Sequence, residues 1–99
     1  MIAILYQWGI REGCMDQFRH DWAAVTEALV ELGSHGSGLF EAPDGSVVAI
    51  ARWPDLATRM ASSGRTARPI EYTRMIAAIE TELQELVLDE ALNKWLPLS

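Results

Sequence analysis

The sequence has little thiol chemistry and little positive charge. One cysteine, Cys14, excludes an intrachain disulfide and leaves no Cys/His pattern for a metal. Eight Lys and Arg stand against fourteen Asp and Glu, which gives a net charge of −6. Proteins that bind nucleic acids neutralise phosphates with clustered Lys and Arg, and the one local cluster here is Arg59, Arg65, Arg68 and Arg74. We therefore expect no nucleic-acid partner, and the same acidity argues against an anionic membrane surface.

Long apolar runs and targeting signals are also missing. No apolar stretch approaches the roughly 20 residues that cross a bilayer, and residues 1–6 carry neither a basic leader nor a signal-cleavage pattern. A cytoplasmic protein is the expectation. Apolar residues nevertheless make up 49% of the 99 residues, with four Trp and four Met. Since so short a chain buries only about 60–70% of its surface alone, we expect a single domain over residues 1–99 whose apolar surplus is covered by another subunit.

Hydrophobic periodicity predicts the elements of the first half. Residues 2–8 form a β-branched and aromatic run that is closed by Gly9, which is typical of a strand covered on both faces. Residues 18–32 carry apolar side chains at helical spacing, and Gly33 supplies a left-handed stop. Residues 39–53 contain two β-type runs around a Pro-Asp-Gly turn, which predicts an antiparallel hairpin.

The second half predicts helices and is ambiguous at its end. Pro54 and Asp55 open a short helix that fails at residues 62–64. A further helix begins at Pro69, and residues 84–91 fit either a strand or a prolongation of that helix. The helix would place four side chains on one face: Tyr72, Ile76, Ile79 and Leu83.

The predicted order is strand, helix, strand, strand, helix or helices, and strand. This order is the split βαβ, ferredoxin-like arrangement of an α+β fold. Such a sheet carries helices on one face only, whereas the first and third strands are apolar on both faces. We therefore predict a homodimer in which the partner's sheet covers the second face.

Two segments resemble the antibiotic-biosynthesis-monooxygenase-like family. A strand leads into a turn with Gly13, and Phe18 and Trp22 follow on the helix. The hairpin strand ends at Trp53 and Asp55 opens the next helix, similar to the family's strand that ends in Trp before a helix-opening Ser or Asp. The resemblance covers roughly residues 2–62. It implies a ferredoxin-like βαββαβ sandwich that forms a dimeric α/β barrel, with a final strand and a pocket between the sheet and the helices.

The resemblance also implies a chemistry. Some members oxidise quinol-like or polyketide aromatics with O2 and no bound cofactor, so a cofactor-independent monooxygenase acting on a small aromatic or quinol-like substrate is implied, with no cofactor and no metal. Haem degradation, found in some relatives, is disfavoured. Quinol-oxidising and haem-degrading relatives often carry His or Trp about nine residues beyond the signature Trp, where this chain has Ser62. The Asn that the haem-degraders carry on the first strand is replaced near Tyr6 or Gln7. The alternative is a non-catalytic dimeric domain that binds a small ligand or serves a structural role.

The candidate site residues are mostly aromatic. His35, in a Gly/Ser-rich stretch, is the candidate proton-transfer residue, because an imidazole can pass a proton at neutral pH; a solvated loop histidine is the alternative. Phe18 and Trp22 are assigned to core packing, and Arg52 to an ion pair at the subunit interface. The candidate substrate-binding residues, each open to a core or surface role instead, are Tyr6, Trp8, Trp53, Met60, Arg68 and Tyr72.

Overall fold

The computed structural model of the chain describes residues 1–95. The elements run in the order β1 (Ile2–Ile10), α1 (Met15–Val30), β2 (Ser37–Glu41), β3 (Val47–Trp53), α2 (Leu56–Ala61), α3 (Gly64–Ala67), α4 (Pro69–Ala77) and β4 (Ile79–Asp89). The strands pair antiparallel in one sheet of order β2-β3-β1-β4. The predicted α+β, ferredoxin-like order is confirmed, and β4 confirms a final strand.

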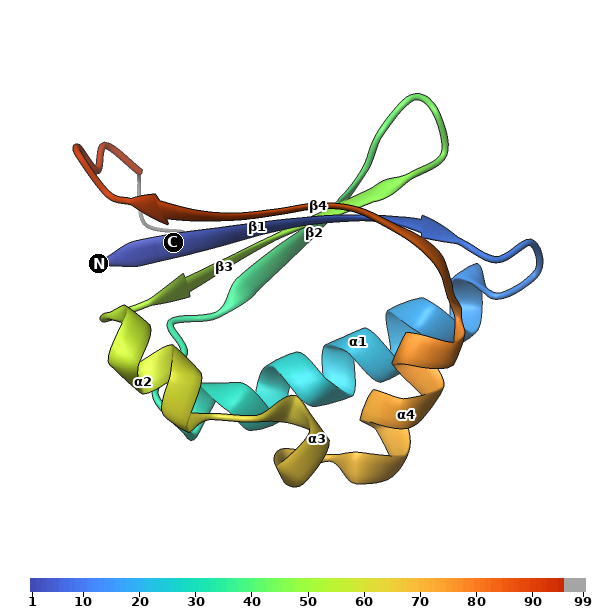
Figure 1. Cartoon of the computed structure of the whole chain (residues 1–99), viewed down its shortest axis with the longest axis horizontal. Coiled ribbons are helices and arrows are strands. Elements are labelled where there is room, and N and C mark those ends of the chain that lie inside the picture. The colour runs from blue at the N-terminus through green and yellow to red at the C-terminus, as the bar shows by residue number, and fades with distance from the viewer. Residues whose placement is uncertain (96–99) are drawn as a thin grey trace.

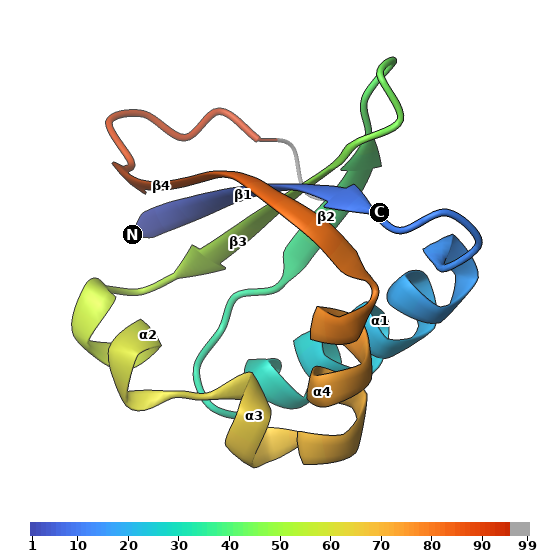
Figure 2. The ribbon, with the colours of Figure 1, turned by 45° about the vertical axis from the view of Figure 1, so that its right-hand side comes forward.

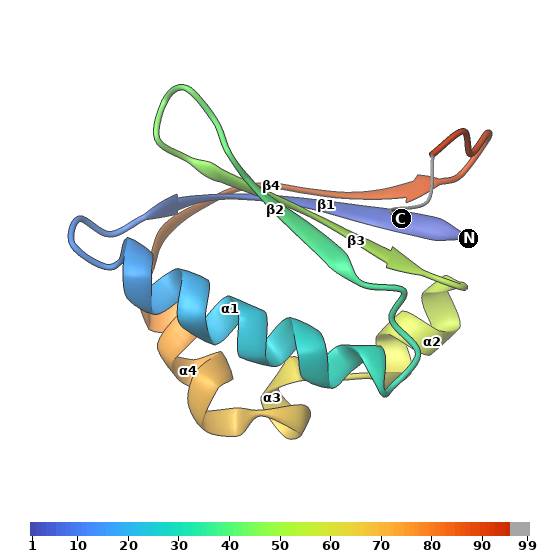
Figure 3. The same ribbon diagram turned by 180° about the vertical axis from the view of Figure 1, so that it is seen from behind.

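The helices lie together on one side of the sheet, as all three ribbon views show (Figure 1, Figure 2, Figure 3). We call this side the inner face; side chains of β1 and β3 alternate onto it, including Ile4, Trp8 and Trp53. The opposite side, the outer face, carries Leu5 and its cross-strand neighbours Ile50 on β3 and Leu86 on β4. No helix of residues 1–95 covers the outer face.

The core lies between the inner face and the helices, in two clusters. Phe18 of α1 is fully buried against Trp8 and Val47, and Trp53 at the end of β3 is buried in the second cluster. Phe18 is thus a core residue, as the sequence predicts. β3 alternates buried and half-buried positions along its whole length, as expected of a central strand with one covered face.

Gly33 ends the path of α1 as the sequence predicts. Its φ is +111°, a conformation that favours glycine, and an added Cβ would lie 2.9 Å from Cγ2 of Thr58. The next residue, Ser34, donates its backbone N–H to the carbonyl of Leu29 at 3.1 Å, which satisfies one of the last carbonyls of the helix. The chain can therefore turn directly from α1 toward β2.

The sequence-based prediction is wrong where α4 meets β4. Ile79 and Leu83 were placed on a helix face, yet α4 ends at Ala77 and β4 begins at Ile79. Residues 79–83 form a strand because β4 pairs with β1 along the edge that β3 leaves open, and this pairing satisfies backbone groups of both strands. A short helix, α3, also begins at Gly64, where the sequence predicted only the end of the preceding helix.

Residues 90–95 turn back beside the outer face. The backbone N–H of Glu90 donates to the carbonyl of Met1 at 3.1 Å, and its carboxylate accepts a hydrogen bond from Arg52 at 2.9 Å. Leu92 and Trp95 line a shallow groove with Ile50 and other residues of that face. The ion pair expected of Arg52 at a subunit interface is therefore made, in this protomer, with its own C-terminal segment.

Candidate functional site

A pocket of about 190 Å³ lies between the inner face and the helices. It exists because β3 places the small side chains of Ala49 and Ala51 at the middle of the inner face, between the larger Val47 and Trp53. On the helical side, Gly64 at the start of α3 has no side chain and so takes up little of this space. The pocket is slightly larger than an apolar cavity of about 150 Å³ that holds benzene, so it accommodates a small planar ring.

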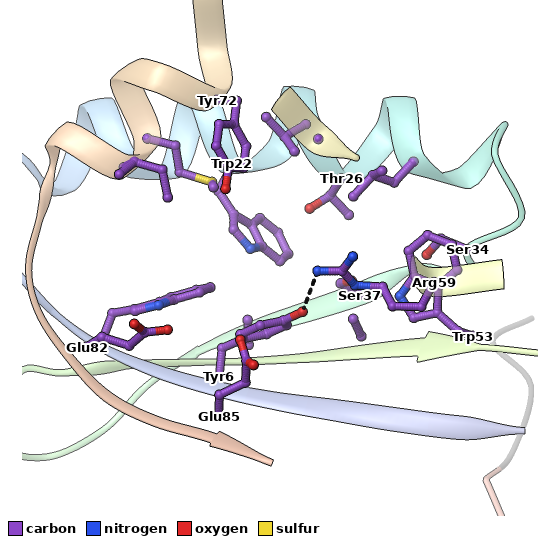
Figure 4. A pocket seen from close by; sticks show the side chains of 18 residues that line it. Tyr6, Trp22, Thr26, Ser34, Ser37, Trp53, Arg59, Tyr72, Glu82 and Glu85 are labelled. Carbon is purple, nitrogen blue, oxygen red and sulfur yellow. Dashed lines mark hydrogen bonds between the residues drawn. The ribbon is translucent and has the colours of Figure 1, made fainter. Parts of the chain in front are cut away.

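Aromatic side chains form the walls of this pocket. Tyr6 and Trp8 of β1 stack at 5.1 Å between ring centroids and form the floor, and Trp8 in turn packs edge-on against Phe18 at 5.6 Å. Trp22 of α1 and Tyr72 of α4 project from the helices toward that floor (Figure 4). Flat rings prefer offset-stacked or edge-to-face partners, so these walls suit an aromatic ligand.

Arg59 of α2 gives one end of the pocket a positive charge. Its guanidinium donates to the Tyr6 hydroxyl at 3.2 Å and to the Ser62 carbonyl at 3.3 Å, and lies 5.8 Å from the Trp53 ring centre. Figure 4 shows Ser34 and Ser37 on the same side of the pocket as Arg59 and Trp53. This end therefore concentrates hydrogen-bond donors over an aromatic surface.

Two side chains fix α2, and with it Arg59. The Asp55 carboxylate caps the helix by accepting the Thr58 N–H at 2.7 Å, and this backbone hydrogen bond lowers the pKa of the Asp55 carboxyl. The buried Ser62 hydroxyl shares its one proton between the carbonyls of Thr58, at 2.9 Å, and Leu32, at 3.3 Å. Ser62 thus ties α2 to the end of α1 and does not line the pocket.

Glu82 and Glu85 of β4 line the pocket at its sheet side. Strand alternation alone would put residues three apart on opposite faces. The pairing of β1 with β4 shifts by one residue between Gln7 and Trp8, so that Glu82 lies opposite Trp8 while Glu85 lies opposite Tyr6. This bulge turns both carboxylates to the inner face, and the pocket has a cationic group on α2 and carboxylates on β4.

The structure brings together most of the predicted aromatic residues. Tyr6, Trp8, Trp53 and Tyr72 all line the pocket. His35 does not line it; the residue is exposed, and its backbone N–H donates to the Arg52 carbonyl at 2.8 Å.

Two further predicted residues lie outside the pocket lining. Met60 is 76% exposed, on the outward side of α2. Arg68 is exposed and paired with Glu71, Nε to Oε2 3.1 Å; its hydrogen bond lowers the pKa of the Glu71 carboxyl. The guanidinium of Arg68 is therefore engaged at the surface.

Sequence reasoning missed Arg59, the two glutamates and the pocket-facing role of Trp22. Arg59 and Met60 are neighbours on a one-and-a-half-turn helix, about 100° apart around its axis. With no longer apolar stripe on so short a helix, the pattern gives no sign of which one faces the sheet. The signal for Trp22 was present, because it lies on the apolar stripe of α1, and a pocket between that stripe and the sheet was expected.

Metal and membrane features are not evident in the part of the chain that the structure describes. Residues 1–95 contain no group of three His, Cys, Asp or Glu side chains placed to hold a metal ion. Among the same residues, no helix has the length and hydropathy required to span a bilayer.

Similarity to known proteins is evident in structure and not in sequence. No protein-family model matches the chain, and no curated protein does. Among solved structures, an antibiotic biosynthesis monooxygenase aligns over 93% of this chain and 100% of its own, with a TM-score of 0.71 and 18% identity. The chain has the fold of the antibiotic biosynthesis monooxygenases. The expected resemblance is confirmed at this level.

Two further solved structures agree. A protein from Chloroflexus aurantiacus J-10-fl aligns with a TM-score of 0.81 at 8% identity, covering 95% of this chain and 96% of that one. SnoaB, a cofactor-independent oxygenase from Streptomyces nogalater, aligns with a TM-score of 0.73 at 17% identity, covering 94% of this chain and 95% of its own. Both share the architecture with this chain over nearly their full lengths.

Proposed function

We propose that this protein is a cofactor-independent monooxygenase that oxidises a small quinol-like or anthrone-like aromatic with O2. The aromatic-walled pocket carries the proposal, since it offers two carboxylates and an arginine to a planar ring. The fold shared with SnoaB, a cofactor-independent oxygenase, supports the same reaction class. A fold by itself licenses no chemistry; the side chains of the pocket supply the groups that the reaction needs.

The reaction requires a substrate that becomes electron-rich on losing a proton. A carboxylate takes a proton from the ring hydroxyl or ring methylene, and the resulting anion reduces O2. One oxygen atom forms the new carbonyl of the product, and the other leaves as water with the two hydrogens that the substrate gives up. The protein supplies a base, orientation and a partly dehydrated site.

Glu85 is the base that we assign to this reaction. It lines the pocket opposite Tyr6 in the sheet, beside the stacked Tyr6 and Trp8 rings. A substrate ring lying on those side chains would place its edge next to the Glu85 carboxylate. His35, the base predicted from the sequence, is exposed like Glu85 but lies outside the lining, so the two assignments give different results on mutation.

Oxygen uptake with a panel of quinols and anthrones tests the function. Wild-type protein should accelerate uptake, and Glu85→Gln should lower the rate roughly hundredfold or more, the usual contribution of a general base. Glu80→Gln on the same strand removes an equal charge outside the pocket and should leave the rate unchanged. A loss in His35→Ala without a loss in Glu85→Gln would move the base to His35. No protein-dependent uptake across the panel would refute the function.

The non-catalytic alternative has one supporting feature. The position where the quinol-oxidising relatives carry His or Trp is Ser62, and its hydroxyl is committed to two backbone carbonyls. A ligand-binding domain would show a raised melting temperature with apolar aromatics, because a ligand that binds only the native state stabilises it. Stabilisation by quinols in the absence of any oxygen uptake would favour this alternative.

We also propose that two chains pair through their outer faces to form a dimeric α/β barrel. Leu86 is 42% and Leu88 44% exposed, and Phe40 of β2 is 55% exposed. All three side chains lie on the outer face with Leu5 and Ile50. An apolar sheet face is stable when another layer covers it, and a second copy offers a face of the same kind.

Light scattering on the purified chain tests the pairing. The wild type should give twice the 11.0 kDa chain mass, and Leu86→Arg should give a monomer because it places a charge in the centre of the contact. Leu56→Arg is the matched control, since Leu56 is 43% exposed on the helical side. A wild-type monomer, or a Leu86→Arg dimer, would contradict the proposal.

A further inference from the structure

We propose that Arg59 and Tyr6 form an anion-binding end of the pocket, and that the pocket selects planar aromatic ligands bearing a negatively charged oxygen. The oxygen belongs to a ring carboxylate or to an ionised ring hydroxyl. The inference rests on the proposed function only in taking this ligand to be the substrate. The binding preference itself is independent of any turnover.

Arg59 has donors to spare and no anionic partner among the residues that the structure describes. A guanidinium has five N–H donors, and Arg59 uses them on the Tyr6 hydroxyl and the Ser62 carbonyl, both neutral acceptors. None of the ion pairs within residues 1–95 includes Arg59. A half-buried cation without a counter-ion is costly, and a bound anion would offset that cost.

The Tyr6 hydroxyl adds a second donor at the same place. Because its oxygen accepts the Arg59 N–H at 3.2 Å, its own proton is directed elsewhere, and no acceptor for it is present among the described residues. Ser34 lies on this side of the pocket as well (Figure 4), where its hydroxyl oxygen accepts the Gly36 N–H at 3.0 Å. Charge-assisted hydrogen bonds from such donors are about twice as strong as neutral ones.

The carboxylates of the pocket give the ligand one orientation. Figure 4 shows Glu82 across the pocket from Arg59, with Tyr6 between them. An anionic group would be repelled from Glu82 and drawn to Arg59, while the ring stacks over Tyr6 and Trp8. The reacting edge of the ligand would then be held away from Arg59, toward β4.

Binding of 1-naphthoate and of its neutral isostere 1-naphthamide, followed by tryptophan fluorescence, tests the inference. Wild-type protein should bind the carboxylate at least about tenfold more tightly, the range of a hydrogen bond to a charged group. Arg59→Gln should bind the two ligands equally, Arg59→Lys should keep part of the preference, and Tyr6→Phe should lower it severalfold. Arg19→Gln changes the net charge equally at a surface residue paired with Glu41 and should behave as wild type.

A second arm separates the two sources of the anionic oxygen. Binding of 4-nitrophenol should strengthen as the ring hydroxyl ionises with rising pH, and that gain should vanish in Arg59→Gln. If only naphthoate shows the preference, the site recognises carboxylates; if only nitrophenolate does, it recognises ring oxyanions. Circular dichroism establishes that each variant is folded.

Three results would overturn the inference: equal wild-type affinity for naphthoate and naphthamide, a preference that survives Arg59→Gln, or no binding of any probe at millimolar concentration. These outcomes are distinct from failure of the proposed function. A protein that prefers naphthoate yet consumes no oxygen keeps the anion site and loses the oxygenase, whereas oxygenation of quinols with no charge preference does the reverse.

Discussion

Gly64→Ala should destabilise the protein even though alanine favours helices over glycine. Gly64 begins α3, and a Cβ there would lie 2.8 Å from Cγ1 of Val25 and 3.0 Å from Cδ2 of Tyr72. Val25 is 5% exposed on α1 and has little room to move. Overpacking of this kind costs about 1–3 kcal/mol, which exceeds the gain of up to about 1 kcal/mol from helix propensity. For a domain of this size, each kcal/mol lowers the melting temperature by about 4–8 °C.

The double variant Gly64→Ala/Val25→Ala isolates the cause. Val25→Ala alone removes buried methyl groups and leaves a cavity, so it also destabilises. In the double variant the new methyl occupies part of that cavity, and the total cost should fall below the sum by about 0.5–3 kcal/mol. Gly9→Ala is the control, because its Cβ would make an ordinary 3.7 Å contact with Thr81. Urea denaturation compares the four variants with the wild type, and additive costs would show that the contact with Val25 does not limit this position.

Two further predictions concern charged residues. Asp55→Ala should lower the melting temperature at neutral pH. The hydrogen bond from Thr58 lowers the Asp55 pKa from 3.8, so the stabilisation by Asp55 is present above that value and is lost as the pH falls further. Thermal melts at several pH values should therefore show wild type and variant converging in acid. Arg74→Gln should lower the free energy of unfolding by about 1 kcal/mol in urea denaturation, because Arg74 is half exposed and forms an ion pair with the fully buried Asp21, Nε to Oδ2 3.4 Å, whose other oxygen contacts His20 at 3.1 Å. A cost no larger than that of Arg19→Gln would refute this role.

The elements that could be predicted are those with strong local signals. Gly33 was identified from its place after the last apolar residue of α1, and its φ of +111° is the physical reason for that position. Pro54 and Asp55 were predicted to open a short helix, and Asp55 makes the capping bond of α2. In both cases the chemistry is contained within a few neighbouring residues.

The elements that could not be predicted depend on distant partners. The end of α4 is set by the pairing of Ile79 with Ile10 in the sheet. The apolar pattern around Ile79 depends only on its neighbours in sequence and cannot predict this pairing. The bulge that turns both Glu82 and Glu85 inward is likewise a property of the β1–β4 ladder. Tyr6, Trp8, Trp53 and Tyr72 were pocket candidates because large aromatic residues line either a core or a cavity. That residue-type rule gives no information about Arg59.

The position of β4 at the edge of the sheet has a consequence for how the protein behaves in solution. One side of β4 pairs with β1, and the other leaves backbone donors and acceptors exposed to further strands. Glu80, Glu82, Glu85 and Asp89 lie along this edge, so a second strand arriving there would meet a row of negative charge, and the two register shifts deny it a flat template. Both obstacles act against growth into fibrils at neutral pH. Near the isoelectric point of 4.7 the charge fades and only the irregular ladder remains, so mild acid is the condition under which this chain would be most prone to cross-β assembly.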